Sequence, residues 1–137
     1  MVDQYTEKAR RAIFFARYEA CVFLSPYIET EHLLLGLLRE NKAIAQGLGS
    51  DFVEAIRRQL MPPSSRKAVS HSLDLLLSDE CKRVLGYAGE EAENLSHKFI
   101  GTEHLLLGLL REENCLGARF LKERSVSIEN VRASLQK

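Results

Sequence analysis

The triplet Thr-Glu-His occurs twice, at residues 30–32 and 102–104, and each copy precedes a run rich in leucine. If a buried helix begins at each triplet, its polar first turn has to lie at the protein surface. The carboxylate of Glu31 or Glu103 then offers two acceptor oxygens that suit the paired N–H groups of a guanidinium. An acid and a threonine are also ordinary residues at a helix start, so simple capping is the competing interpretation.

Two further polar residues, Thr6 and Ser78, precede long amphipathic segments, and an acidic residue follows each of them. This pattern predicts that both are N-caps. The hydroxyls and free amide groups at a helix N-terminus favour an anion such as phosphate. The candidate binding residues are therefore Glu31, Glu103, Thr6 and Ser78, for a ligand that carries a cation and a phosphate together.

His32 and His104 raise an alternative function, a small metal-dependent enzyme that uses the two Glu-His pairs. A helical zinc site needs two histidines four residues apart, and this spacing is absent here, so we interpret both histidines as structural. The sequence also lacks GxxxxGK[ST], GxGxxG and GxSxG, the motifs of nucleotide sites and nucleophile elbows. We expect a binding module with no catalytic residue, no metal and no cofactor.

The elements that carry these residues are duplicated. The eleven residues TEHLLLGLLRE at 30–40 recur at 102–112, and a shift of 72 positions also aligns the flanking segments. Such a repeat indicates a duplicated structural unit. Apolar spacing predicts helices after Thr6 and Ser78, at the two blocks with Thr30 and Thr102 as N-caps, and over 44–48, 52–60, 116–122 and 128–136. The prediction is an all-α fold of eight helices in two pseudo-symmetric four-helix repeats.

Gly36 and Gly108 lie inside the repeated blocks, where glycine costs about 1 kcal/mol relative to alanine. We infer that another helix crosses each of them too closely for a Cβ. The predicted organisation is a first repeat over 1–60, a linker over 61–77 and a second repeat over 78–137, packed together as one domain. The leucines at the end of the linker (Leu73, Leu75, Leu76 and Leu77) are expected to pack on the core.

Composition narrows the possible partners. Nineteen basic and nineteen acidic residues cancel, which argues against nucleic acid. No apolar stretch reaches the roughly 20 residues of a membrane span, and the N-terminus lacks a signal-peptide core, so we expect a cytoplasmic protein without a membrane partner. The many leucines leave a structural dimerisation module open as a third function.

Taken together, the T-E-x-A start of the first long helix and the doubled TEHLLLGLL resemble the N-terminal repeat domain of the Clp ATPases, closest to the ClpC type. The resemblance covers nearly the whole chain. It implies a domain that recruits protein substrates and adaptor proteins to an AAA+ unfoldase and its protease. It also implies phospho-arginine binding at one pocket per repeat, with Glu31 and Glu103 holding the guanidinium. An ATPase module in cis or in trans is the implied partner.

Several positions depart from the pattern of that family, among them residues 40–45 and 112–117, which replace its Gly-rich segment after the central helix. Glu29 stands where a glycine usually precedes the Thr-Glu-His triplet, and Ser78 replaces a threonine. The extra carboxylate of Glu29 would repel a phosphate beside the pocket that contains Glu31. We therefore expect phosphate binding to be weaker at that pocket than at the one that contains Glu103.

Overall fold

The computed structural model describes residues 4–60 and 75–136, and these residues form eight α-helices with two isolated β-bridges. The predicted all-α class and the count of eight are thus confirmed for the described part of the chain. Most of the predicted linker, residues 61–74, lies outside it. The helices are α1 (Glu7–Val22), α2 (Thr30–Glu40), α3 (Lys42–Gly47), α4 (Phe52–Leu60), α5 (Asp79–Asn94), α6 (Thr102–Arg111), α7 (Leu116–Glu123) and α8 (Ile128–Leu135).

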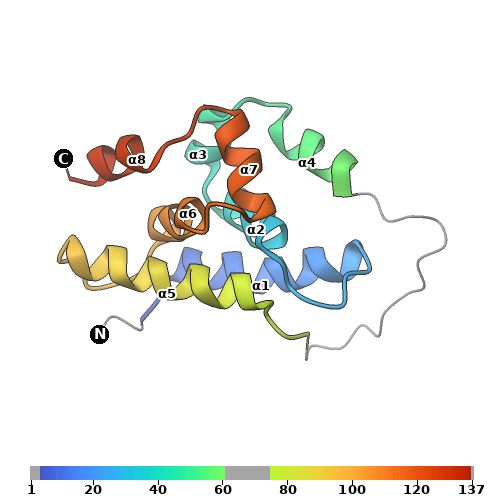
Figure 1. Cartoon of the computed structure of the whole chain (residues 1–137), viewed down its shortest axis with the longest axis horizontal. Helices are drawn as coiled ribbons and strands as arrows, with labels where there is room; N and C mark the ends of the chain where they lie inside the picture. The colour runs from blue at the N-terminus through green and yellow to red at the C-terminus, as the bar shows by residue number, and fades with distance from the viewer. Residues whose placement is uncertain (1–3, 61–74, 137) are drawn as a thin grey trace.

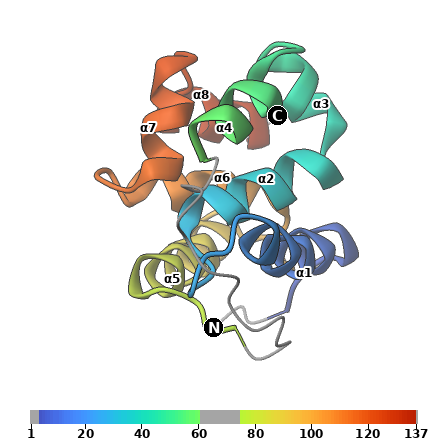
Figure 2. The ribbon, with the colours of Figure 1, turned by 90° about the vertical axis from the view of Figure 1, so that its right-hand side faces the viewer.

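The helices form three tiers that are visible in both views (Figures 1 and 2). The long helices α1 and α5 form one outer tier, α2 and α6 lie in the middle, and the four short helices cover the other side. The two copies of TEHLLLGLLRE are therefore the central elements of the fold. This position explains why they are apolar on nearly every face.

The long helices begin and end in the same way. Thr6 Oγ1 accepts a hydrogen bond from the Ala9 N–H at 3.1 Å, and Ser78 Oγ accepts one from the Cys81 N–H at 3.1 Å, so both predicted N-caps are confirmed. After each helix one residue adopts a left-handed conformation, Leu24 and Ser96, both with φ of 58°. Matching caps at a spacing of 72 show that the pseudo-symmetry extends to the backbone.

The glycines of the central helices mark close helix crossings, as predicted. A Cβ on Gly36 would overlap the carbonyl oxygen of Ala12 in α1. In the second repeat a Cβ on Gly108 would overlap the carbonyl oxygen of Val84 in α5. Each repeat therefore packs its long helix directly against the backbone of its central helix.

In each repeat a buried carboxylate of the first helix pairs with an arginine of the last helix. Glu19 of α1, 1% exposed, accepts two hydrogen bonds from the guanidinium of Arg57 in α4, at 2.7 and 2.9 Å. Glu91 of α5 accepts two from Arg132 of α8, at 2.9 and 2.7 Å. Residues of both repeats also belong to one hydrophobic core.

Two predictions need correction, the start of α3 and the burial of one leucine of the linker. Helix α3 begins at Lys42 rather than at Ile44, because the Asn41 side chain caps it by accepting from the Ile44 N–H at 3.0 Å. Leu75 and Leu77 pack on the core as expected, but Leu76 is 67% exposed. Leu73 lies outside the described residues.

Candidate functional site

Each Thr-Glu-His triplet starts its helix one residue earlier than predicted. The N-caps of α2 and α6 are Glu29 and Gly101, and the prediction that Thr30 and Thr102 take this position is wrong. The histidines explain the difference, because His32 Nδ1 accepts from the Glu29 N–H at 2.9 Å and His104 Nδ1 accepts from the Gly101 N–H at 2.8 Å. The third residue of the triplet thus satisfies an amide that would otherwise have no partner.

The two threonines instead link the repeats. Thr30 Oγ1 accepts from the Gly117 N–H of α7 at 3.1 Å, and Thr102 Oγ1 accepts from the Asn41 side chain at 2.9 Å. In both cases the donor lies in the short third helix of the opposite repeat or at its cap. These bonds fix the start of each central helix against the other half of the molecule.

Two short parallel bridges bring the predicted binding residues together across the repeats. The Thr6 N–H donates to the carbonyl of Ile100, two residues before the second triplet, at 2.9 Å. By the same pattern the Ser78 N–H donates to the Ile28 carbonyl at 2.9 Å, before the first triplet. The candidate sites are therefore composite, with Thr6 beside the segment of Glu103 and Ser78 beside that of Glu31.

At the first composite site (Thr6 with Glu103), Gly101 leaves room between the two side chains. A Cβ built on Gly101 would lie 3.7 Å from Glu103 Oε1 and 3.8 Å from Thr6 Cγ2. The half-buried Glu103 accepts a hydrogen bond from Thr102 Oγ1 at 3.1 Å, and it forms no ion pair with any residue the structure describes. A carboxylate without a basic partner thus lies next to the positive end of α1.

The second composite site (Ser78 with Glu31) is more acidic. Burial raises the pKa of Glu31 above its ordinary value of 4.5, and the nearby charges of Glu29 and Glu80 raise it further. Glu29 occupies the position of Gly101 in the other site. Within the described chain Glu31 has no ion-pair partner either, but the carboxylates around it disfavour an anion.

The histidines are structural, as interpreted from the sequence. Since His104 Nδ1 accepts a backbone N–H, its Nε2 carries the proton and donates to His97 Nδ1 at 2.8 Å. Burial lowers the pKa of His32 to about 4, so its ring is neutral at neutral pH. In the described residues no three His, Cys, Asp or Glu side chains form a group that could hold a metal ion.

Two residues that fix the composite sites carried no functional prediction, Asn41 and Gly117. The sequence could have identified Asn41 as an N-cap, since asparagine is a preferred residue at this position and a short apolar segment follows it. Gly117 has a close packing role, because a Cβ there would lie 3.1 Å from the Thr30 carbonyl oxygen. Neither partner, Thr102 or Thr30, can be identified from local spacing.

The duplicated helical unit and the paired helix starts now have a counterpart among known proteins. The model of the Clp repeat (R) N-terminal domain matches residues 4–124 and 76–137 of this chain. The chain belongs to this family. The Clp repeat domain described here is 34% identical over 138 residues to "Negative regulator of genetic competence ClpC/MecB" of Bacillus subtilis, which covers 96% of the chain. It is 35% identical over 141 residues to "ATP-dependent Clp protease ATP-binding subunit ClpC" of Staphylococcus aureus, which covers 100% of it.

Solved structures agree with this assignment. The N-terminal domain of the Arabidopsis thaliana chaperone ClpD superimposes with a TM-score of 0.74 at 29% identity, over 98% of this chain and 93% of that one. The N-terminal domain of Candida albicans Hsp104, at 18% identity and a TM-score of 0.75 over 96% and 88% of the chains, shares the fold.

The Clp repeat domain spans a small part of its curated relatives. It corresponds to 16% of the Bacillus subtilis protein and 17% of the Staphylococcus aureus protein. None of the helices in the described ranges has the length and apolar character to cross a membrane.

Proposed function

We propose that this Clp repeat domain recognises protein substrates and adaptor proteins for a Clp ATPase, whose AAA+ module acts in cis or in trans. The names of the relatives support this role, since one of them is the ATP-binding subunit of an ATP-dependent protease. In this proposal the domain itself binds without catalysing a reaction, and neither nucleic acid nor a membrane is its partner.

We further propose that the first composite site, Thr6 with Glu103, binds phospho-arginine. The observation that carries this is the half-buried carboxylate of Glu103, which has no ion-pair partner in the described chain, whereas the buried acids Glu19 and Glu91 are held by arginine. Glu31 is also unpaired there, but Glu29 and Glu80 lie near it. The carboxylate suits the guanidinium of the ligand, and the amides at the start of α1 suit its phosphate.

The second composite site, Ser78 with Glu31, is proposed to prefer an unmodified arginine. It has the same carboxylate and the same helix start, but Glu29 and Glu80 raise its negative charge. A phosphate would lie among three carboxylates there, whereas a bare guanidinium would be attracted by all of them.

The test is a titration with a short peptide that contains one phospho-arginine. Glu103→Gln keeps the size of the side chain but removes the charge, and we expect it to weaken binding about twentyfold, as for a lost charge-assisted hydrogen bond. Glu31→Gln is the matched control and should change the affinity less than about threefold. The assignment fails if both variants bind like the wild type, or if the peptide with unmodified arginine binds equally well to the Thr6 and Glu103 site.

A further inference from the structure

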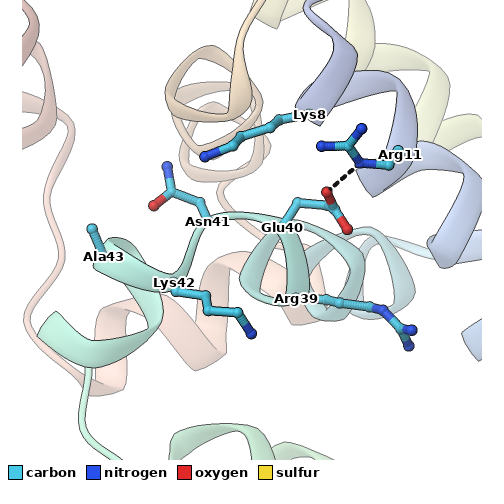
Figure 3. Close-up of a pocket in the computed structure, with 7 residues that line it drawn as sticks. All are labelled: Lys8, Arg11, Arg39, Glu40, Asn41, Lys42 and Ala43. Carbon is cyan, nitrogen blue, oxygen red and sulfur yellow. Dashed lines mark hydrogen bonds and ion pairs between the residues drawn. The ribbon is translucent and has the colours of Figure 1, made fainter.

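A basic cleft lies between α1 and the turn that joins α2 to α3. Its volume is about 560 Å³, and its lining includes four basic residues and one acidic residue. Figure 3 shows Lys8 and Arg11 extending from α1 toward Asn41 and Glu40, while the side chains of Arg39 at the end of α2 and Lys42 at the start of α3 extend on the other side of these two residues. Because the whole chain has a net charge of zero, this concentration of positive charge is a local feature.

Most of the positive charge in the cleft is not neutralised. Glu40 accepts a hydrogen bond from Arg11 Nε at 2.7 Å, so its charge is already balanced. Lys8 and Lys42 are exposed, and neither forms an ion pair with a residue in the described ranges. The amines are therefore available to a ligand.

Arg39 likewise forms no ion pair with a carboxylate in residues 4–60 and 75–136. Its guanidinium lies over the Phe15 ring, 3.8 Å from the centroid. The corresponding Arg111 of the second repeat is instead bound to Glu90 at 2.9 Å and to Glu91 at 3.1 Å. The first repeat thus keeps an exposed arginine in position without neutralising it.

The fold does not require these charges. At the same spacing of 72, Glu80 and Asn114 stand in the second repeat in place of Lys8 and Lys42. The two repeats share their backbone pattern, yet only the first has a strongly basic surface at this place. The backbone pattern that the repeats share therefore does not depend on Lys8 and Lys42.

An apolar row continues from the cleft along α1. Starting at Arg11, the exposed side chains at intervals of three and four residues are Phe14, Tyr18 and Val22, which are 55%, 55% and 45% exposed. Such a row on a helix is one continuous face. The corresponding residues of the second repeat are small or polar: Gly86, Glu90 and Asn94.

We propose that the basic cleft and the apolar row together bind an acidic segment of a protein partner. The carboxylates of the segment enter the cleft and pair with Lys8, Lys42 and Arg39, and its apolar side chains lie along the row of α1. A protein segment fits better than nucleic acid, because three large apolar side chains follow the charges directly. This surface adjoins the composite site of Thr6 and Glu103, since Lys8 lies in the first turn of α1 and Asn41 donates to Thr102 Oγ1, but it binds its ligand through different side chains.

The probe is a fluorescein-labelled peptide of glutamates with central leucine and phenylalanine residues, measured by fluorescence anisotropy. The variant Lys8→Glu with Lys42→Glu should weaken binding at least about tenfold, and Tyr18→Glu about fivefold. Both lysines lie in the first turn of a helix, where an acidic residue is favourable, so the fold is retained. Raising the salt concentration should weaken binding of the wild type.

The matched control is Lys82→Glu with Lys98→Glu, which changes the net charge equally at two exposed residues of the second repeat. It should bind the peptide within about twofold of the wild type, as should Glu103→Gln, so the outcome is independent of the phospho-arginine proposal. The inference is overturned if the control loses as much affinity as the cleft variant, or if a single-stranded oligonucleotide or inorganic phosphate competes as well as the peptide. It is also overturned by self-association that Tyr18→Glu abolishes, which would assign the apolar row to a second copy.

Discussion

Gly36→Ala is expected to lower the free energy of unfolding by about 3 kcal/mol, although alanine is the better helix former. The new Cβ would overlap the carbonyl oxygen of Ala12, which belongs to the backbone of α1 and cannot turn away. The two helices would have to separate along their main contact. Urea denaturation followed by circular dichroism measures the change.

The same substitution at Gly86 is the control and should have the opposite sign. Gly86 lies inside α5, and a Cβ there would meet no atom within 4 Å. Gly86→Ala should therefore raise the free energy of unfolding by about 0.5–1 kcal/mol. If Gly36→Ala also stabilised the protein, α1 and α2 would not cross as closely as described.

Glu91→Gln is expected to cost about 2 kcal/mol of stability. The side chain of Glu91 is 2% exposed and accepts hydrogen bonds from Arg111 and Arg132. Glutamine retains the shape but removes the anion that Arg132 binds, while Arg111 keeps only its exposed partner Glu90. The arginines are 25% and 45% exposed and can turn partly toward water, which keeps the cost below that of a fully buried pair.

The dependence on pH provides a second measurement on the same residue. The Arg132 hydrogen bonds hold the pKa of Glu91 below its ordinary value of 4.5. The unfolded chain therefore binds the proton more readily, so the contribution of Glu91 is present above about pH 4.5 and is lost as the pH falls through the folded pKa. Glu91→Gln should flatten this part of the stability profile.

Glu90→Gln is the matched control, because Glu90 binds the same Arg111 but its side chain is 59% exposed. We expect a change in the free energy of unfolding below about 0.5 kcal/mol, as for an exposed ion pair. Equal effects at the two positions would contradict the view that burial makes Glu91 the structural anion.

Much of the fold could be predicted because the signals for it lie within short segments and occur in both repeats. Thr6 and Ser78 cap their helices as their sequence context predicts, and Gly36 and Gly108 mark the crossings that their place inside apolar helices suggested. These features depend on helical periodicity and on capping chemistry, which act over a few residues. A second copy of each signal made the prediction stronger.

The composite nature of the sites could not be predicted from the sequence, because it depends on which elements meet across the repeats. Local reasoning placed Thr30 and Thr102 as caps, whereas their hydroxyls bind Gly117 and Asn41 of the opposite repeat. The pairing of Thr6 with Glu103 likewise depends on a backbone bridge of distant residues. Sequence symmetry alone is equally compatible with sites formed within each repeat.

The most direct test of the account is a two-dimensional amide NMR titration of the labelled domain with free phospho-arginine. The composite site predicts that the amides of residues 6–8 and 101–104 shift together along one binding curve, while those of 76–80 and 28–31 respond much less. Shifts confined to residues 6–8 alone or to residues 101–104 alone would contradict a binding site shared between the repeats. A joint response of residues 78–80 with 101–104 would contradict it as well.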